Sequence, residues 1–387
     1  MDIGYYNSYL EIDLEIIRQS ISKVKQHIGK NVDIIPVVKG NAYGMGLVEM
    51  SRFLLKYCPD MLACGQVAEA VELRAAGIDC EILIMSGIPN HALDTAVELG
   101  LQIPVYNIET AVKVSEIAAK KNKQAKLHIK IDTGLNRIGV KPGKPLKELI
   151  SCIKQLNNLV IDGVYTHFSN ATVVNDGFTL VQLDSFKSAL EQIKLENITP
   201  RFIHCRNTGA VSWLSESIST HVRVGTLLFG FPGMDDGSNL LGLGKEPESW
   251  RAFITNINEL NTGDSCGYGH AFIADKPTRI ATIDVGYGDG LFRPLVINKG
   301  PVLVGNIRTR YLSAAMDQTF IDVTDIPCCI GDEVTIFGYS KGGAALELAE
   351  LEQVTGHTMT YLQSTLSKRV KRVYINQEEN KYDRRML

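Results

Sequence analysis

The chain alternates between short, continuously apolar runs and longer segments whose apolar residues recur at helical spacing. Short runs of this kind are typical of strands that are buried on both faces. The segments between them, such as VAEAVELRAAG and LDSFKSALEQIKLE, have the periodicity of amphipathic helices. The predicted strands cover residues 34–38, 61–64, 81–85, 102–106, 126–132, 159–166, 201–205 and 222–228.

A series of strand, helix and strand forces parallel pairing with right-handed crossovers. Eight such units close into a barrel, so we predict an α/β fold, a (β/α)8 TIM barrel, over residues 11–238. A doubly wound open sheet is the alternative, although such a sheet usually has fewer strands. Asp13 can cap the first predicted helix, and Gly29 can end it.

After about residue 240 the pattern changes. Turn sequences such as NTGD, GYGDG, IGDE and SKGG separate short alternating strands, including RIATIDVG, QTFIDV and EVTIFG. Longer helical patterns return only at 344–353 and 360–367. We therefore predict a second, mainly β domain over residues 239–387, which a strand within residues 1–10 joins across space.

Composition and charge limit the classes of function. The 387 residues, of which 45% are hydrophobic and 21% charged, fit a globular protein of two domains. A net charge of -3 without a long basic run argues against nucleic acid and anionic membranes as partners. The N-terminus lacks the apolar core of a signal peptide. The eight cysteines show no CxxC spacing, so we expect free thiols and a cytoplasmic protein.

The apolar run from Ile34 to Val38 stops at Lys39, which a glycine-containing turn, GNAYG, follows. In α/β barrels the active site lies at the C-terminal ends of the strands. A lysine that is partly desolvated there has a lowered pKa and can bond covalently to an aldehyde. By itself the residue would be better explained as a solvated surface charge, because most lysines at strand ends are of that kind.

Polar residues also follow the other predicted strands. Taken singly, a histidine among them can be a satisfied core residue, and Lys130 with Asp132 can be a structural ion pair. Their collection at one edge of one barrel predicts a site instead. The Gly225-Thr226 turn after the last strand fits a barrel phosphate site. The other candidates are Arg137, His167, His204, Asn207, Thr208 and Arg223.

A reactive lysine, a phosphate cradle and arginines at one barrel mouth together indicate pyridoxal 5'-phosphate (PLP) as the cofactor. A metal-dependent aldolase on the same fold would need a cluster of histidine, cysteine and aspartate ligands near the C-terminus. Only His357 is available there, so we expect no metal.

The stretch PVVKGNAYGMG (36–46) resembles the cofactor-lysine motif of the alanine racemases, which are two-domain, fold-type III PLP enzymes. Further stretches match the motifs of this family in the same order, and the resemblance runs from about residue 9 to 374. These stretches are KIDTGLNRIGV (130–140), THF (166–168), VRVGTLLFG (222–230), CGYG (266–269), GYGDG (286–290), AMDQ (315–318) and RVKRVY (369–374).

The resemblance implies a homodimeric isomerase with shared active sites that interconverts L- and D-alanine, a step of D-alanine biosynthesis and peptidoglycan precursor supply. Lys39 would hold PLP covalently and serve as one base. The second base would be Tyr268 of the partner subunit, on the opposite face of the substrate. His204 and Arg223 would form the relay that lowers the pKa of this tyrosine, and Arg223 would also face the ring nitrogen of the cofactor.

The resemblance also implies the binding residues. Arg137 and the Met316 backbone would hold the substrate carboxylate. Lys130 falls where many members carry a carbamylated lysine. The implied cofactor-binding residues are Lys39, Tyr43, His167, Asn207, Thr208, Arg223, Gly225, Thr226 and Tyr361.

Two positions depart from the family pattern, and both belong to the entrance of the site. Thr172 follows Ala171 where an aspartate is usual, and Ser313 lies in a stretch that lacks the usual arginine. The loss of charged gates could admit larger amino acids such as serine, lysine or ornithine, whereas the ring of Tyr361 limits side-chain size. A fold-type III decarboxylase is a weaker alternative, because its glycine-triplet loop and cysteine motif are missing. A non-catalytic PLP carrier would resemble the barrel alone.

Overall fold

The computed structural model describes residues 3–231 and 233–377. The chain divides into two compact units. The barrel unit runs from Arg18 to Gly244, and the β unit combines the residues up to Ile17 with those from Lys245 onward. These bounds lie a few residues from the domain limits expected from the sequence, because the strand near the N-terminus extends to Asp13.

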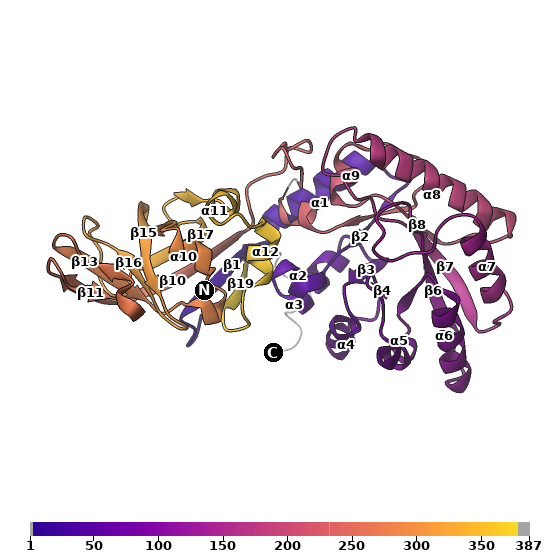
Figure 1. Ribbon diagram of the computed structural model, residues 1–387, viewed down its shortest axis with the longest axis horizontal. Coiled ribbons are helices and arrows are strands. Elements are labelled where there is room, and N and C mark those ends of the chain that lie inside the picture. The colour runs from indigo at the N-terminus through magenta and orange to yellow at the C-terminus, as the bar shows by residue number, and fades with distance from the viewer. Residues whose placement is uncertain (1–2, 232, 378–387) are drawn as a thin grey trace, which may run out of the picture. The chain divides into compact units, whose positions relative to one another are not determined.

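Eight parallel strands form the wall of the barrel unit (Figure 1). β2 pairs with β9, and β3 to β8 pair in sequence order. An isolated bridge between Val37 and Ala63 joins β2 to β3, and the Thr220 N–H donates to Ile203 O (2.9 Å) beside β8 and β9. The strands are β2 (Asp33–Pro36), β3 (Met61–Cys64), β4 (Glu81–Ile84), β5 (Gln102–Val105), β6 (Ala125–Lys130), β7 (Leu159–Tyr165), β8 (Phe202–His204) and β9 (His221–Val224).

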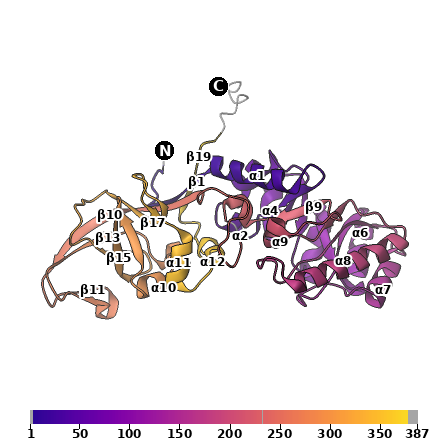
Figure 2. The ribbon, with the colours of Figure 1, turned by 90° about the horizontal axis from the view of Figure 1, so that it is seen from above.

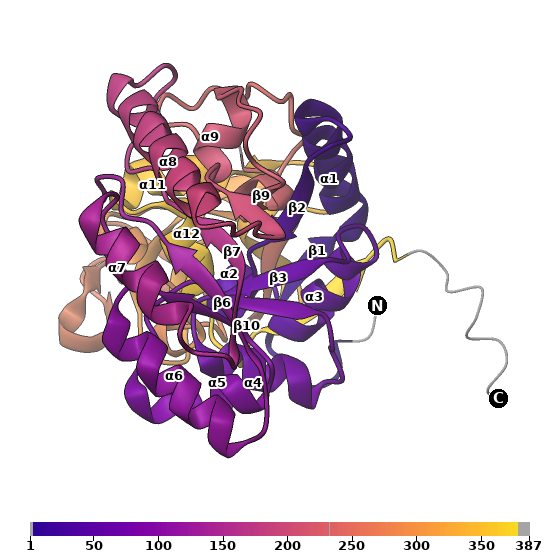
Figure 3. The same ribbon diagram turned by 90° about the vertical axis from the view of Figure 1, so that its right-hand side faces the viewer.

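Helices surround these strands (Figure 3). The predicted cap of the first helix is present, since the Glu15 N–H donates to Asp13 Oδ1 (3.0 Å). The helices are α1 (Leu14–Ile28), α2 (Lys39–Tyr43), α3 (Leu47–Leu55), α4 (Val67–Ala75), α5 (Leu93–Glu98), α6 (Ile108–Lys120), α7 (Lys144–Ile153), α8 (Gly177–Leu195) and α9 (Thr208–Trp213), with short 3-10 turns η1 (Asn90–Ala92) and η2 (Thr226–Phe229).

Alternate residues of the strands fill the barrel interior, which is why the strands read as continuously apolar. One buried cluster within it comprises Ile35, Val37, Met61, Ala63, Leu83 and Phe202. The predicted α/β fold, a barrel with a mainly β second domain, is confirmed. Several predicted strands run past the observed ends, most of all β9, which ends at Val224 and not at residue 228. Gly225 has φ -114° and ψ -89°, which leaves the strand conformation and starts η2.

The β unit is built on a nine-stranded sheet (Figures 1 and 2). Its order is β18-β17-β14-β15-β16-β13-β10-β1-β19, and β17 also pairs with β10, which closes six of the strands into a ring. The strands of the unit are β1 (Ser8–Asp13), β10 (Glu248–Leu260), β11 (Ser265–Cys266), β12 (Phe272–Ile273), β13 (Thr278–Ile283), β14 (Pro301–Val304), β15 (Ile307–Ala314), β16 (Thr319–Asp322), β17 (Glu333–Tyr339), β18 (Ala345–Leu346) and β19 (Lys371–Ile375). Its helices are α10 (Arg293–Ile297), α11 (Leu348–Thr355) and α12 (Met359–Ser364), with turns η3 (Tyr268–His270) and η4 (Tyr287–Asp289).

Glu248 gives the β unit a pH-dependent stability. It lies fully buried at the start of β10, where burial raises its pKa to about 8 and Gln363 donates a hydrogen bond to its carboxylate. The folded state therefore binds a proton that the unfolded state has released, and its stability falls as pH rises from the ordinary carboxyl pKa through about 8.

Replacing Glu248 with glutamine should abolish much of this pH dependence. At pH 9 the variant should be more stable than the parent chain by up to about 5 kcal/mol, because each unit of pKa shift corresponds to about 1.36 kcal/mol. Urea unfolding at pH 5 and pH 9 measures the effect. Glu259→Gln, an exposed position on the same strand, is the control and should leave the pH dependence unchanged. Equal pH dependence in all three proteins would contradict the prediction.

Among the described residues, no helix combines the length and apolar character that crossing a membrane requires.

Candidate active site

Lys39 begins a strained turn, which Val37 and Val38 connect to the end of β2. The four residues Gly40 to Tyr43 all have positive φ, between 52° and 63°, so α2 is wound in the left-handed sense after its first residue. Each non-glycine residue in this conformation costs roughly 1–2 kcal/mol. Hydrogen bonds from Ala42 N to Val38 O (2.8 Å) and from Gly44 N to Gly40 O (2.9 Å) hold the turn. Such strain persists where the surrounding structure fixes it, and it is concentrated at functional sites.

Glu69 on α4 supports this turn. Its Oε1 accepts from the Gly40 N–H (2.6 Å), and its Oε2 accepts from the Gly65 N–H (2.7 Å). Glu69 is not among the site residues predicted from the sequence. The spacing of Gln66 and Glu69 at the start of a helical pattern resembles a capping box, and that signal could have identified it.

The Lys39 ammonium has a lowered pKa. The surrounding protein partly shields it from water, which is the main cause, and the positive charge of Arg137 adds to the effect. The Glu69 carboxylate acts in the opposite direction. Lys39 is nevertheless exposed at the surface of the isolated chain, so its amine remains accessible. A shielded but accessible amine of this kind can act as a nucleophile and as a base.

Arg223 is buried and makes a network of hydrogen bonds on β9. Its Nη1 donates to His204 Nδ1 (2.8 Å) and His204 O (2.9 Å), and its Nη2 donates to Thr166 O (2.7 Å) and Cys205 O (3.3 Å). Burial lowers its pKa to about 10, so it stays charged at neutral pH. Its Nε–H donates to no protein group in the described ranges, which leaves one directed donor for a ligand.

The two candidate histidines are both held neutral. Burial, and next the charge of Arg223, place the pKa values of His204 and His167 well below their usual range. Since a guanidinium can only donate, Nδ1 of His204 accepts and the proton of this ring lies on Nε2. His167 Nδ1 lies 3.4 Å from Arg223 Nη2. The structure thus brings both histidines to the same guanidinium.

Lys130 does not pair with Asp132, although the sequence left that ion pair open. Asp132 instead pairs with Lys141 (2.8 Å) and accepts from the Gly134 and Asn136 N–H groups (3.1 and 3.0 Å). It therefore shapes the loop that carries Arg137. The Lys130 ammonium lies 4.4 Å from the centre of the Tyr165 ring. Burial places its pKa well below the usual range.

Arg137 lies on this loop and is exposed. Within the residues that the structure describes, its guanidinium makes no hydrogen bond and no ion pair with the protein. Its charge nevertheless lowers the pKa values of Lys39, Lys130 and His167, so the four side chains lie within electrostatic range of one another. A free guanidinium beside these groups is suited to a carboxylate or a phenolate.

A second part of the site gathers around the Gly225 turn. A Cβ added at Gly225 would overlap the hydroxyl of Tyr43, and one at Gly233 would lie 2.7 Å from Thr208 Cγ2. The Gly225 N–H faces Thr208 Oγ1 at 3.4 Å, and Asn207 caps α9 by accepting from Ala210 N (3.2 Å). Thr226 is the first residue of η2. Hydroxyl groups thus surround a backbone that only glycine permits.

The β unit carries the remaining three candidates. Tyr268 is 86% exposed in η3, and Met316 is also exposed. The Met316 carbonyl accepts from Gly288 N (2.9 Å), whereas its own N–H makes no hydrogen bond in the described part of the chain. Tyr361 is half-exposed and packs its ring against Phe292 and His357, at centroid distances of 5.2 and 5.0 Å.

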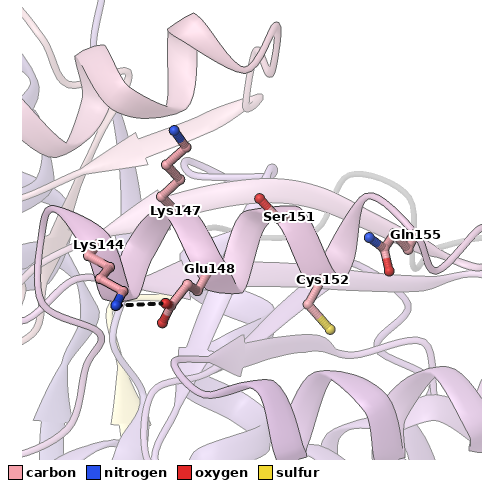
Figure 4. A pocket seen from close by; sticks show the side chains of 6 residues that line it. All are labelled: Lys144, Lys147, Glu148, Ser151, Cys152 and Gln155. Atoms are coloured by element: carbon pink, nitrogen blue, oxygen red, sulfur yellow. Dashed lines mark ion pairs between the residues drawn. The ribbon is translucent and has the colours of Figure 1, made fainter.

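A hollow on the outer face of α7 is separate from all of these residues (Figure 4). It is lined by Lys144, Lys147, Glu148, Ser151, Cys152 and Gln155, none of which is a candidate site residue. All six come from one helix or its end, and the Lys144–Glu148 pair at 3.7 Å bridges one edge. It carries none of the chemistry described above.

Two family models match the chain. One is described as alanine racemase, N-terminal domain, over residues 12–232, and the other as alanine racemase, C-terminal domain, over residues 248–374. Alanine racemase 1 of Clostridium acetobutylicum is 33% identical over 375 residues, 96% of this chain and 96% of that protein. The chain belongs to the alanine racemase family. It is therefore an isomerase of the amino-acid racemase type.

Solved structures of the family agree with this assignment. An alanine racemase from Clostridium difficile 630 superposes with a TM-score of 0.90 at 28% identity and covers 97% of each chain. The alanine racemase from Bacillus anthracis, determined with bound L-Ala-P, gives the same TM-score, identity and coverage.

Proposed function

We propose that this member of the alanine racemase family interconverts L- and D-alanine with PLP, by a two-base mechanism that uses Lys39 and Tyr268 of the partner subunit. The observation that carries the proposal is the accessible Lys39 amine of lowered pKa, held on a strained turn beside the unpaired Arg137. Membership of the family supports the reaction and the substrate.

The residues of the barrel unit fit PLP. The phosphate would lie against the Gly225 backbone, with Tyr43, Asn207, Thr208 and Thr226 around it, because a side chain at Gly225 would fill this space. Lys39 would bond covalently to the cofactor, and the free Nε–H of Arg223 would donate a hydrogen bond to the ring nitrogen of PLP. His167 would contact the ring, and Tyr361 of the β unit would complete the phosphate ligands.

When bound, PLP supplies an aldehyde for covalent attachment of an amine and a conjugated ring that delocalises negative charge from the substrate Cα. The protein provides everything else. Arg137 and the Met316 N–H would bind the substrate carboxylate and fix its orientation. The Lys39 amine, once freed, would remove or return the Cα proton on one face, and the Tyr268 phenol would do so on the other.

The exposure of Tyr268 supports a site completed by a second chain. A catalytic phenol that is 86% open to water could not control a proton, since general acid–base chemistry needs a fixed and shielded group. Docking of Tyr268 of the partner subunit at the barrel mouth would place it near His204 and Arg223. We therefore propose an obligate homodimer.

Replacing Gly225 with alanine should weaken PLP binding about tenfold or more, because the added methyl group would collide with the Tyr43 hydroxyl and fill the cradle. The shift of the PLP absorption band during titration of apoenzyme measures the affinity. Gly244→Ala is the matched control, since a Cβ there meets no atom within 4 Å. Equal affinity for PLP in both variants would contradict the proposal that the Gly225 turn binds the phosphate.

Lys130 is proposed as a carbamate. It is only 3% exposed and has a pKa well below its usual range, so its neutral amine can add CO2 and release a proton. The resulting anion would pair with Arg137 and hold it. Protein exchanged into 13C-bicarbonate should show one carbamate carbon by NMR, and Lys130→Met should remove it. An unchanged spectrum in that variant would contradict the modification.

The function is tested with PLP-loaded protein and L-alanine in heavy water. We expect D-alanine to form, with deuterium entering at Cα. The same assay with serine, lysine and ornithine tests a broader range, which the absence of charge at Thr172 and Ser313 favours. Ser313 is buried, and the Gly267 backbone packs directly on it, so this position leaves no charged group beside Tyr268. Decarboxylation or no reaction would overturn the proposed activity.

A further inference from the structure

Three ligand-type side chains meet at the base of the barrel, at the opposite ends of the strands from Lys39. Asp33 is the first residue of β2, Asp60 immediately precedes β3, and His221 is the first residue of β9. One ligand atom from each residue lies within 4.8 Å of the others. Figure 3 shows the three strands within the barrel unit.

The surroundings of His221 give independent evidence that this cluster binds an ion. Its ring is only 7% exposed, and its Nδ1 shares a hydrogen bond with Thr220 Oγ1 (2.8 Å). Its Nε2 is buried and has no hydrogen-bond partner. Asp60 Oδ2 is its nearest carboxylate oxygen at 3.6 Å, which is too long for a hydrogen bond. Leaving such a nitrogen unpaired costs about 1–3 kcal/mol.

The separation that is too long for a hydrogen bond suits two ligands of one metal ion. Zinc binds imidazole nitrogen and carboxylate oxygen at about 2.0–2.2 Å in a tetrahedron, so neighbouring ligand atoms lie roughly 3.4 Å apart. We infer that Asp33, Asp60 and His221 form a structural site for a divalent transition metal, with Zn2+ as the best fit and water as the fourth ligand.

The location explains what such an ion would do. The eight parallel strands are paired as two separate sheets, β2 with β9 and β3 to β8, and an isolated bridge at Val37 and Ala63 joins β2 to β3 toward the catalytic end. The three ligands come from both sides of this seam at its other end. The ion would fasten the base of the barrel at a seam where β2 and β3 share an isolated bridge instead of a continuous ladder, and it takes no part in the racemisation.

The neighbouring cations do not compete for this position. Arg201 is already paired with Asp162 (2.8 Å) and Glu81 (3.1 Å). Lys25 donates to the Tyr57 carbonyl. The remaining competing explanation is an ion pair between a protonated His221 and Asp60.

The test uses PLP-loaded, full-length protein treated with EDTA, re-exposed to equimolar ZnCl2 and separated from free metal. Asp60→Asn removes one exposed ligand, and Asp79→Asn, an exposed aspartate just before β4, is the matched control. We expect the zinc content of the parent chain and of the control to exceed that of Asp60→Asn by one zinc ion per chain. Calorimetric titration should show at least about tenfold weaker zinc binding in Asp60→Asn.

Thermal unfolding separates the two explanations. Zinc should raise the Tm of the parent chain and of Asp79→Asn but not that of Asp60→Asn, while racemisation by all three stays equal. Equal zinc content in the three proteins overturns the site. If the Tm of Asp60→Asn is lower than that of the parent chain in the absence of zinc, and zinc changes the Tm of none of the three proteins, the metal site is overturned in favour of the ion pair.

Discussion

Lys39→Ala is expected to lower kcat for alanine racemisation by about 10^4-fold or more, because the change removes a base and the cofactor's covalent anchor together. The strained left-handed turn after Lys39 is held by Glu69 and by backbone hydrogen bonds, none of which involves the lysine amine. The variant should therefore fold normally. Circular dichroism checks the fold, and production of D-alanine checks the rate.

Mixing Lys39→Ala and Tyr268→Phe chains tests the shared site more sharply than either variant alone. If each site takes Lys39 from one chain and Tyr268 from the partner subunit, one of the two sites in every mixed dimer is intact. Random reassembly at equal amounts should then restore about a quarter of the parent activity. Activity that stays at the level of the separate variants in confirmed mixed dimers would rule out the exchange.

Arg223→Lys is expected to lower kcat/KM by about 10^2-fold or more and the free energy of unfolding by about 2–4 kcal/mol. A lysine cannot reproduce the paired donors to His204, Thr166 and Cys205, so buried carbonyl oxygens lose their partners. Replacement by glutamate, Arg223→Glu, would be a poorer test, because the new carboxylate would face these same oxygen atoms. Urea unfolding and steady-state kinetics measure the two effects.

Arg201→Lys is the matched control for this change. Arg201 is exposed, and its partners are the Asp162 and Glu81 carboxylates, which a lysine can also bind. Its effect on stability should stay within about 1 kcal/mol. Arg223→Lys could lower stability and leave kcat/KM and the absorption of bound PLP unchanged. That result would limit Arg223 to a structural role.

The barrel strands were predictable because burial on both faces leaves a continuous apolar signature, and the predicted starts of β3 and β5 match the observed ones. The left-handed turn was not predictable. Asn41 tolerates positive φ, but Ala42 and Tyr43 disfavour it, and only Glu69 and the tertiary structure impose it. The conformational preferences of the local sequence do not reveal where tertiary contacts impose a disfavoured backbone conformation.

The candidate site was predictable to the extent that strand ends converge. Lys130 and Asp132 were expected at one strand end, yet β6 stops at Lys130, so Asp132 enters a loop and pairs with Lys141. The network of Arg223 depends on carbonyl groups, which no residue pattern reveals. The three clustered residues Asp33, Asp60 and His221 are far apart in the sequence, and their spacing resembles no metal-binding motif.

The position of β1 determines the order in which the chain can mature during translation. β1 pairs with β10 on one side and, in parallel, with β19 (Lys371–Ile375) on the other. All strands of the barrel unit have been synthesised by Val224, whereas β1 gains its last neighbour only after Ile375 has been synthesised. A nascent chain should therefore acquire a protease-resistant barrel first. Both edges of β1 stay uncovered until β10 (Glu248–Leu260) is made, and one edge stays uncovered until β19 is made, so β1 offers a binding site to chaperones.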